Sequence, residues 1–341
     1  MKRRETRRGG IFLLTANSGR QRFAVALSLF FSFVHFCRGD VDLRNGVIGR
    51  FADVDEGVRI LTTKDEFIVR MSPFDRSARM KTDKAISEAE FLRFIEANVR
   101  AWTADEKRTV GSAIERVRPG LDALSLSLPK VIYFVKTTGA EEGKAFYTRD
   151  TAIVLPEDEL ISKNGMLEKV ICHELFHIFS RENPALREKL YEIIGFTECP
   201  EIEFPLELKS RKITNPDAPR NGHLIRLRSD GREILAVPIL FSKVDKYDLK
   251  RGGEFFDYLQ FKFLELEKAG PSYFKPAMQG TEPKLHGPEQ VIGFFEQIGR
   301  NTQYVIHPEE ILADNFAILV MGQTGASPEI LQKMKDVLGR K

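Results

Sequence analysis

The chain has 341 residues, of which 42% are hydrophobic and 30% charged, and its formal net charge is +3. This length suits one catalytic unit with one or two lobes, and the composition gives no sign of disorder beyond the N-terminus. Much of the positive charge lies in residues 1–22. The rest of the chain is near neutral or acidic, which excludes a basic face for nucleic acid as the basis of its function.

An apolar run without formal charge, FAVALSLFFSFVHFC, occupies residues 23–37. Fifteen helical residues would span about 22 Å, less than the roughly 30 Å hydrocarbon core of a membrane. A basic segment followed by a short apolar run is typical of a secretory signal. We therefore expect residues 1–39 to be a signal peptide or an N-terminal membrane anchor. The protein would be exported, either periplasmic or secreted, and would contact a membrane only through this segment if it stays uncleaved.

The first elements after this segment are expected to be short strands and turns over residues 47–71. Phe67, Val69 and Met71 would share one side of a strand there. Two helices should follow, because Ser87 with Glu90, and Thr103 with Glu106, have the spacing of capping boxes.

Two β-rich runs, 131–135 and 152–155, come next and predict two strands of a small sheet. A helix should begin near Asn164 or Gly165 and carry MLEKVICHELFHIF. Asn183 and Pro184 then have the order of a helix cap and first helical position, with Gly195 as a stop.

The remaining chain mixes strands and helices. Residues 223–242 form two β-rich runs joined by a Ser-Asp-Gly turn, which predicts a hairpin, and FFDYLQFKFLELE adds a strand. After a loop rich in Gly and Pro, QVIGFFEQI and HPEEILADNF have helical patterns. The fold class predicted from these elements is α+β.

The sequence His173-Glu174-Leu175-Phe176-His177 matches the H-E-x-x-H motif. On a helix, its two histidines lie one turn apart on one face and can bind one Zn²⁺, with Glu174 beside the open coordination position as general base. The alternative is that all three are ordinary helix residues. That alternative would bury these polar side chains without hydrogen-bond partners, because the flanking residues are apolar almost all round the helix.

A third zinc ligand is expected from the helix that begins at Pro308. Glu310 and Asp314 lie one turn apart on it, so Glu310 would bind the metal and Asp314 would accept the free ring N–H of a liganding histidine. The alternative is a capped, solvated acidic helix start, which is the role expected for Glu309. Glu198 is the reserve ligand.

The local extension of the motif that would supply a third histidine is absent, because Ser180 and Asn183 occupy its glycine and histidine positions. An oxyanion donor is also needed. Tyr304 is the first choice, because it precedes the ligand helix on the side expected to face the cleft; His307 and His223 are the alternatives.

In HELFH followed downstream by EILAD, the chain resembles the gluzincins, the thermolysin-like zinc peptidases. The resemblance covers these two helices and, loosely, the strand AIVLP before the first. It implies a zincin-like fold over residues 40–341, with a small antiparallel sheet packed on the active-site helix, a mainly helical C-terminal part, and a cleft between 130–200 and 288–325. It also implies a peptide or protein substrate that pairs with strand 152–155 as a sheet edge.

Other functions use the same residues. A zinc amidase acting on non-protein amides needs the same ligands and base, and a catalytically silent secreted scaffold would keep only the zinc-binding helix. Cys172 and Cys199 would either form a disulfide in an oxidising compartment or remain two buried thiols.

Overall fold

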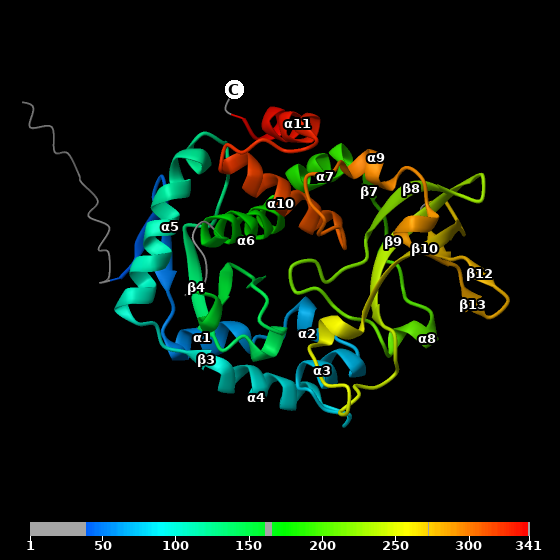
Figure 1. Ribbon diagram of the computed structural model, residues 1–341, viewed down its shortest axis with the longest axis horizontal. Coiled ribbons are helices and arrows are strands. Elements are labelled where there is room, and N and C mark those ends of the chain that lie inside the picture. Colours follow the sequence, from blue (N-terminus) through cyan, green and yellow to red (C-terminus); the bar gives the residue numbers. More distant parts are fainter. Residues whose placement is uncertain (1–38, 161–165, 272, 340–341) are drawn as a thin grey trace, which may run out of the picture. The chain divides into compact units, whose positions relative to one another are not determined.

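The computed structural model describes residues 39–160, 166–271 and 273–339. The expected signal segment lies outside these residues except for Gly39, and the expected start of the motif helix at Asn164 or Gly165 also lies outside them. Within the described ranges there are eleven α-helices and two six-stranded sheets, so the fold is α+β (Figure 1). No helix in these ranges is long and apolar enough to cross a membrane.

The first sheet has the strand order β1-β2-β4-β6-β5, with β3 also paired to β4. Its strands are β1 Val41–Arg44, β2 Val47–Phe51, β3 Val99–Arg100, β4 Val131–Thr137, β5 Tyr147–Arg149 and β6 Ala152–Pro156. The strands predicted at 131–135 and 152–155 are therefore present as β4 and β6. The sheet is mixed, however, and not antiparallel as expected, because β2, β4 and β6 run parallel. The long helical connection between β2 and β4 makes this parallel pairing possible.

Strand β6 is not the edge of this sheet. It lies between β4 and β5, and β5 is the edge. The expectation that residues 152–155 form the edge is therefore wrong. With only three residues, β5 is too short for an alternating pattern to reveal it.

Five helices cover residues 54–122. They are α1 Val54–Leu61, α2 Glu66–Arg70, α3 Pro73–Arg79, α4 Glu88–Asn98 and α5 Ala104–Asp122. The capping boxes predicted at Ser87 and Thr103 are confirmed. The strand expected to contain Phe67 is wrong: the segment is α2, because the side chain of Asp65 caps it by accepting a hydrogen bond from the amide of Ile68 at 3.1 Å.

The motif helix is α6, Met166–Glu182, and α7, Pro184–Ile193, follows it as predicted. Gly195 then adopts a left-handed φ of 83°. Helix α6 packs against α5 and against α10, Pro308–Val320. The rings of Phe176 and Phe316 meet there with centroids 5.5 Å apart, and Figure 1 shows α6 and α10 together beside the first sheet. This packing positions the residues of the candidate site.

The second sheet has the strand order β11-β10-β9-β8-β7 and includes β14. The predicted hairpin is confirmed as β8 and β9, with Asp230 and Gly231 at positive φ in its turn. This sheet makes the part after α6 richer in strands than the mainly helical part expected. The helix predicted over QVIGFFEQI is limited to α9. The remaining elements are β7 Phe196–Glu198, α8 Leu206–Lys209, β8 His223–Ser229, β9 Arg232–Ser242, β10 Leu259–Lys268, β11 Phe274–Pro276, β12 Met278–Gln279, β13 Glu282–Pro283, β14 Leu285–His286, α9 Phe294–Ile298 and α11 Pro328–Leu338.

A buried ion cluster joins α3 to two loops. The fully buried side chain of Arg79 pairs with Asp75 and donates to both carboxylate oxygens of Glu142, at 2.9 and 2.7 Å. It also donates to the carbonyl of Thr214 at 3.1 Å. Because each charge has a partner of opposite sign, the cluster avoids the cost of burying an isolated ion. It also fixes the chain at Thr214.

We expect Arg79→Ala to lower the free energy of unfolding by about 3–5 kcal/mol, because it leaves Asp75 and Glu142 buried without their cation. Urea denaturation of the metal-free protein measures this. The control is Arg226→Ala, whose partner Glu233 is also exposed, with an expected loss below about 1 kcal/mol. Similar losses in the two variants would contradict the interpretation.

Candidate metal site

Helix α6 presents its two motif histidines on one face. His173 and His177 are four residues apart, so they lie one turn apart, and their ring centroids are 4.8 Å apart. The side chain of His177 is almost fully buried, whereas that of His173 is 13% exposed. The Nε2 atoms of both rings approach the same carboxylate on α10.

That carboxylate belongs to Glu310. Its Oε2 lies 3.0 Å from Nε2 of His173 and 3.6 Å from Nε2 of His177. Possible ligand atoms of the three residues lie within 4.8 Å of one another, a grouping that could hold a metal ion. The other oxygen of Glu310 accepts a hydrogen bond from Nδ2 of Asn215 at 2.6 Å. Burial opposes ionisation of Glu310, but the neighbouring His177 and His173 hold its pKa well below the usual value.

Two buried polar atoms beside this group have no hydrogen-bond partner among the described residues. They are Nε2 of His177 and Oε2 of Glu174, in residues that are only 1% and 3% exposed. An unpaired buried polar atom is costly, and such atoms in a native structure are a mark of an unseen ion or water. A metal bound by Nε2 of His177, with a water near Glu174, would satisfy both. The residues present therefore fit a metal ion.

The second nitrogen of each ring faces a carboxylate from α10. Nδ1 of His173 lies 3.2 Å from Oδ1 of Asp314. The same oxygen pairs with Lys169, and Oδ2 of Asp314 accepts a hydrogen bond from Thr302. Nδ1 of His177 lies 3.0 Å from Oε1 of Glu309. Such contacts fix the tautomer that leaves Nε2 free for a metal.

The buried position of Glu309 corrects the expectation of a solvated helix start. It is 3% exposed, and besides His177 it accepts hydrogen bonds from Ser180 and Tyr191. The helix that carries it enters the core, so adjacent residues can both reach α6. The signal in the sequence was the apolar run that follows Glu310, since a helix that is apolar all round is a buried one.

The first-choice oxyanion donor, Tyr304, and its two alternatives have defined surroundings. The ring of Tyr304 is 6.3 Å from that of His173, and Tyr304 is 43% exposed. His223 contacts Glu188 at 2.9 Å, and Nδ1 of His307 accepts a hydrogen bond from the amide of Glu309. These two histidines are therefore already engaged.

The reserve ligand and the cysteines also have defined positions. Glu198 is exposed on β7 and belongs to neither group of potential metal ligands found in the described ranges. Cys172 and Cys199 are both free and buried, so they form no disulfide with each other. Burial raises the pKa of the Cys172 thiol to about 12.

Asp217 is the residue that sequence reasoning missed. It forms a second grouping with Glu174 and His177, whose possible ligand atoms also lie within 4.8 Å of one another. Its Oδ1 accepts a hydrogen bond from the backbone amide of Thr148, on strand β5, at 2.7 Å. The residue lies in an irregular loop without periodicity, so no local pattern in the sequence indicated it.

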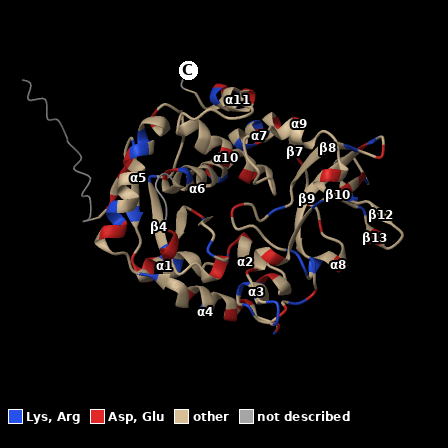
Figure 2. Ribbon diagram, viewed as in Figure 1, with Lys and Arg blue, Asp and Glu red and all other residues tan. Residues whose placement is uncertain are grey.

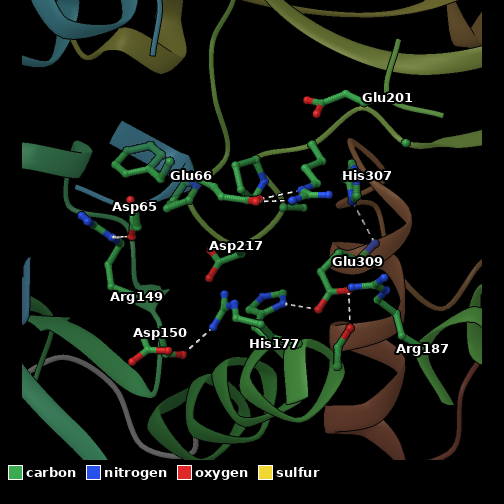
Figure 3. A pocket seen from close by; sticks show the side chains of 18 of the residues that line it. Asp65, Glu66, Arg149, Asp150, His177, Arg187, Glu201, Asp217, His307 and Glu309 are labelled. Carbon is green, nitrogen blue, oxygen red and sulfur yellow. Dashed lines mark hydrogen bonds and ion pairs between the residues drawn. The ribbon is translucent and has the colours of Figure 1, made fainter. Parts of the chain in front are cut away.

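A cavity of about 810 Å³ adjoins the site. Figure 3 shows Asp217 and His177 in this cavity, and a dashed line joins His177 to Glu309. Most residues of the segments 59–67 and 216–223 also contribute to the lining. Acidic and basic side chains both line it. Charged residues of both signs are also interspersed along many elements of the chain (Figure 2). The cavity is large enough for a peptide-sized ligand.

We expect Glu309→Gln to lower the affinity for Zn²⁺ by about 10- to 100-fold, because the variant weakens the contact that orients His177. Competition with a chromophoric chelator measures the affinity. Glu289→Gln is the matched control, since the side chain of Glu289 is 71% exposed. Equal affinities of the two variants would contradict the role assigned to Glu309.

The pKa of His173 in the metal-free protein is raised from 6.5 to about 9. Burial lowers the pKa, but hydrogen bonds with Asp314 and Glu310 raise it by more. The protonated ring therefore stabilises the metal-free fold fully below about pH 6.5, and this contribution is lost as the pH rises through about 9.

We therefore expect His173→Gln to lower the free energy of unfolding of the metal-free protein. The loss should be larger at about pH 6 than at about pH 9.5. Urea denaturation of both proteins at both pH values measures the difference. A difference that does not change with pH, or that grows at the higher pH, would show that His173 is not held protonated by these carboxylates.

Comparison of the chain with models of protein families, with curated proteins and with solved structures gives no match in any of the three. The resemblance to gluzincins therefore rests on HELFH, EILAD and, loosely, the strand AIVLP, and the zincin-like fold stays a prediction. What the structure adds is the meeting of His173, His177 and Glu310 in one candidate metal site.

Proposed function

We propose that the protein is a zinc-dependent peptidase with Glu174 as general base. The observation that carries the proposal is the approach of two imidazole Nε2 atoms to Glu310, beside the unpaired Oε2 of Glu174. Two histidines and one carboxylate are a ligand set of catalytic zinc sites, in which a water or substrate completes the coordination. The intact Glu174 favours an enzyme over a silent zinc-binding protein.

A bound zinc ion would lower the pKa of a water molecule toward about 7 and polarise the carbonyl of the substrate. Glu174 would take the proton from this water and later deliver it to the leaving amine. In the metal-free site, burial and the nearby Asp217 raise the pKa of Glu174 to about 8. A group that gains and loses a proton near neutral pH suits both steps.

The surrounding residues would prepare the ligands. Asp314 and Glu309 hold the Nδ1 protons of the two histidines, which leaves each Nε2 available to zinc. Tyr304 would donate its hydroxyl to the developing oxyanion, because its ring lies beside that of His173. The peptide would occupy the adjoining cavity and extend toward the edge strand β5.

The location of this activity follows from the N-terminal sequence. The basic residues before the apolar run 23–37 support export of the unit formed by residues 40–341. The substrate would then be a peptide or protein in the periplasm or outside the cell, and any membrane contact would come from the N-terminal segment.

We expect the purified protein to hold one zinc per chain, and His177→Ala and Glu310→Ala to lose it. Glu174→Gln should keep the zinc but hydrolyse a peptide library about 10²- to 10⁴-fold more slowly, because it lacks the general base. Elemental analysis and peptide mass spectrometry measure these results. Glu198→Ala is the control and should retain zinc and activity.

Three outcomes would contradict this function. Absence of zinc after metal-supplemented purification would remove the metal site. Zinc without hydrolysis of any substrate would favour a binding or scaffold protein. Hydrolysis of non-protein amides, with no cleavage of peptides, would favour an amidase.

A further inference from the structure

Residues 214–220 form a segment that runs past the candidate metal site. We propose that Asp217 in this segment binds the same metal in the resting protein and that the segment thereby keeps the catalytic centre closed until a substrate displaces it. This inference rests on the proposed function and concerns the regulation of that site.

The position of Asp217 is the first observation. Its carboxylate shares a grouping with Glu174 and His177, whose potential ligand atoms lie within 4.8 Å of one another. His177 also belongs to the group with His173 and Glu310. Because both groupings contain His177, whose Nε2 makes no hydrogen bond to a described residue, we place Asp217 at the same metal position, on the side of the general base.

The charges around this position need a cation. Glu174 and Asp217 share a grouping with His177, and Glu310 shares the other, so three carboxyl groups lie near one imidazole. The backbone amide and the hydroxyl of Thr148 both donate to Oδ1 of Asp217, and neither of these hydrogen bonds uses Oδ2. A divalent cation bound by this second oxygen would offset the repulsion and the lost hydration of the carboxylates.

The second observation is that Asp217 is hydrogen-bonded to the edge of the first sheet. The backbone amide of Thr148 belongs to the edge strand β5, and an extended peptide would need such outward-facing amides to pair with the sheet. Asp217 already accepts the hydrogen bond from this amide. One side chain therefore takes both a hydrogen bond that a substrate would use and the space beside Glu174.

The segment is held at both ends. At its start, the amide of Thr214 donates to the buried Asp75 at 2.9 Å, and Asn215 donates to Glu310. At its end, Arg220 forms a two-point ion pair with Glu66. Pro216 and Pro219 restrict the backbone between these anchors, which lowers the entropy cost of keeping the segment in place.

The number of protein ligands at the zinc determines whether the catalytic centre is closed. A zinc ion with four protein ligands has the coordination of a structural site, whereas catalysis requires a position for water or substrate. With Asp217 bound, the chain supplies four ligands. A substrate must replace Asp217 at the metal and take over the amide of Thr148, so turnover is limited by the fraction of molecules in which Asp217 is released.

The test compares the native protein with Asp217→Asn, which keeps the size and a hydrogen-bond acceptor, and with Asp217→Ala. Acetohydroxamate is the probe, because it chelates zinc only where coordination positions are open. Its dissociation constant is measured by calorimetry on zinc-loaded protein, beside zinc content and peptide turnover. Asp245→Asn is the control, since that side chain is 89% exposed and pairs with Arg211.

We expect both Asp217 variants to keep one zinc per chain and to bind acetohydroxamate at least about tenfold more tightly than the native protein. The reason is that Asp217 no longer competes with the probe for the metal. Peptide turnover should rise by a similar factor, and the control should match the native protein. Unchanged acetohydroxamate binding in zinc-loaded variants would overturn the closure and leave the peptidase proposal standing. Loss of zinc from both variants would also overturn it, because Asp217 would then be a required ligand. A native protein without zinc would overturn both proposals.

Discussion

The packing of α6 against α10 determines the candidate site, because these two helices supply His173, His177 and Glu310. Apolar contacts such as Phe176 with Phe316 exclude water from the interface. Polar groups placed there must find partners, and the carboxylates on α10 meet both nitrogens of the two rings. Nε2 of His177 and Oε2 of Glu174 still make no hydrogen bond to the described residues, and they mark the candidate metal position.

Local spacing made the two halves of this site predictable. His173 and His177 share a helix face because they are four residues apart, and the same holds for Glu310 and Asp314. Caps such as Ser87 also depend only on neighbouring residues, so the boundaries of several helices followed from the sequence. That the two helices meet is a tertiary fact, and it was inferred from the chemistry of zinc ligands instead of from any pattern.

The features that escaped prediction depend on contacts between distant parts of the chain. The edge strand β5 has three residues, and its role is defined by its pairing with β6. Glu309 is buried because α10 as a whole enters the core. Asp217 reaches the site because Thr214, close before it, is fixed by the Arg79 cluster. None of these placements leaves a periodic signal.

The Arg79 cluster and the candidate metal site share the same segment, and this arrangement has a physical reason. Buried ion pairs gain little net stability over apolar packing, but breaking one is costly, so they define position better than they add stability. The cluster at Thr214 therefore restricts where Asn215 and Asp217 lie relative to Glu310 and His177. A segment held only by apolar contacts could slide by a residue. One anchored by directional ion pairs and hydrogen bonds keeps a carboxylate beside the metal position while the far side of the cavity stays open to a ligand.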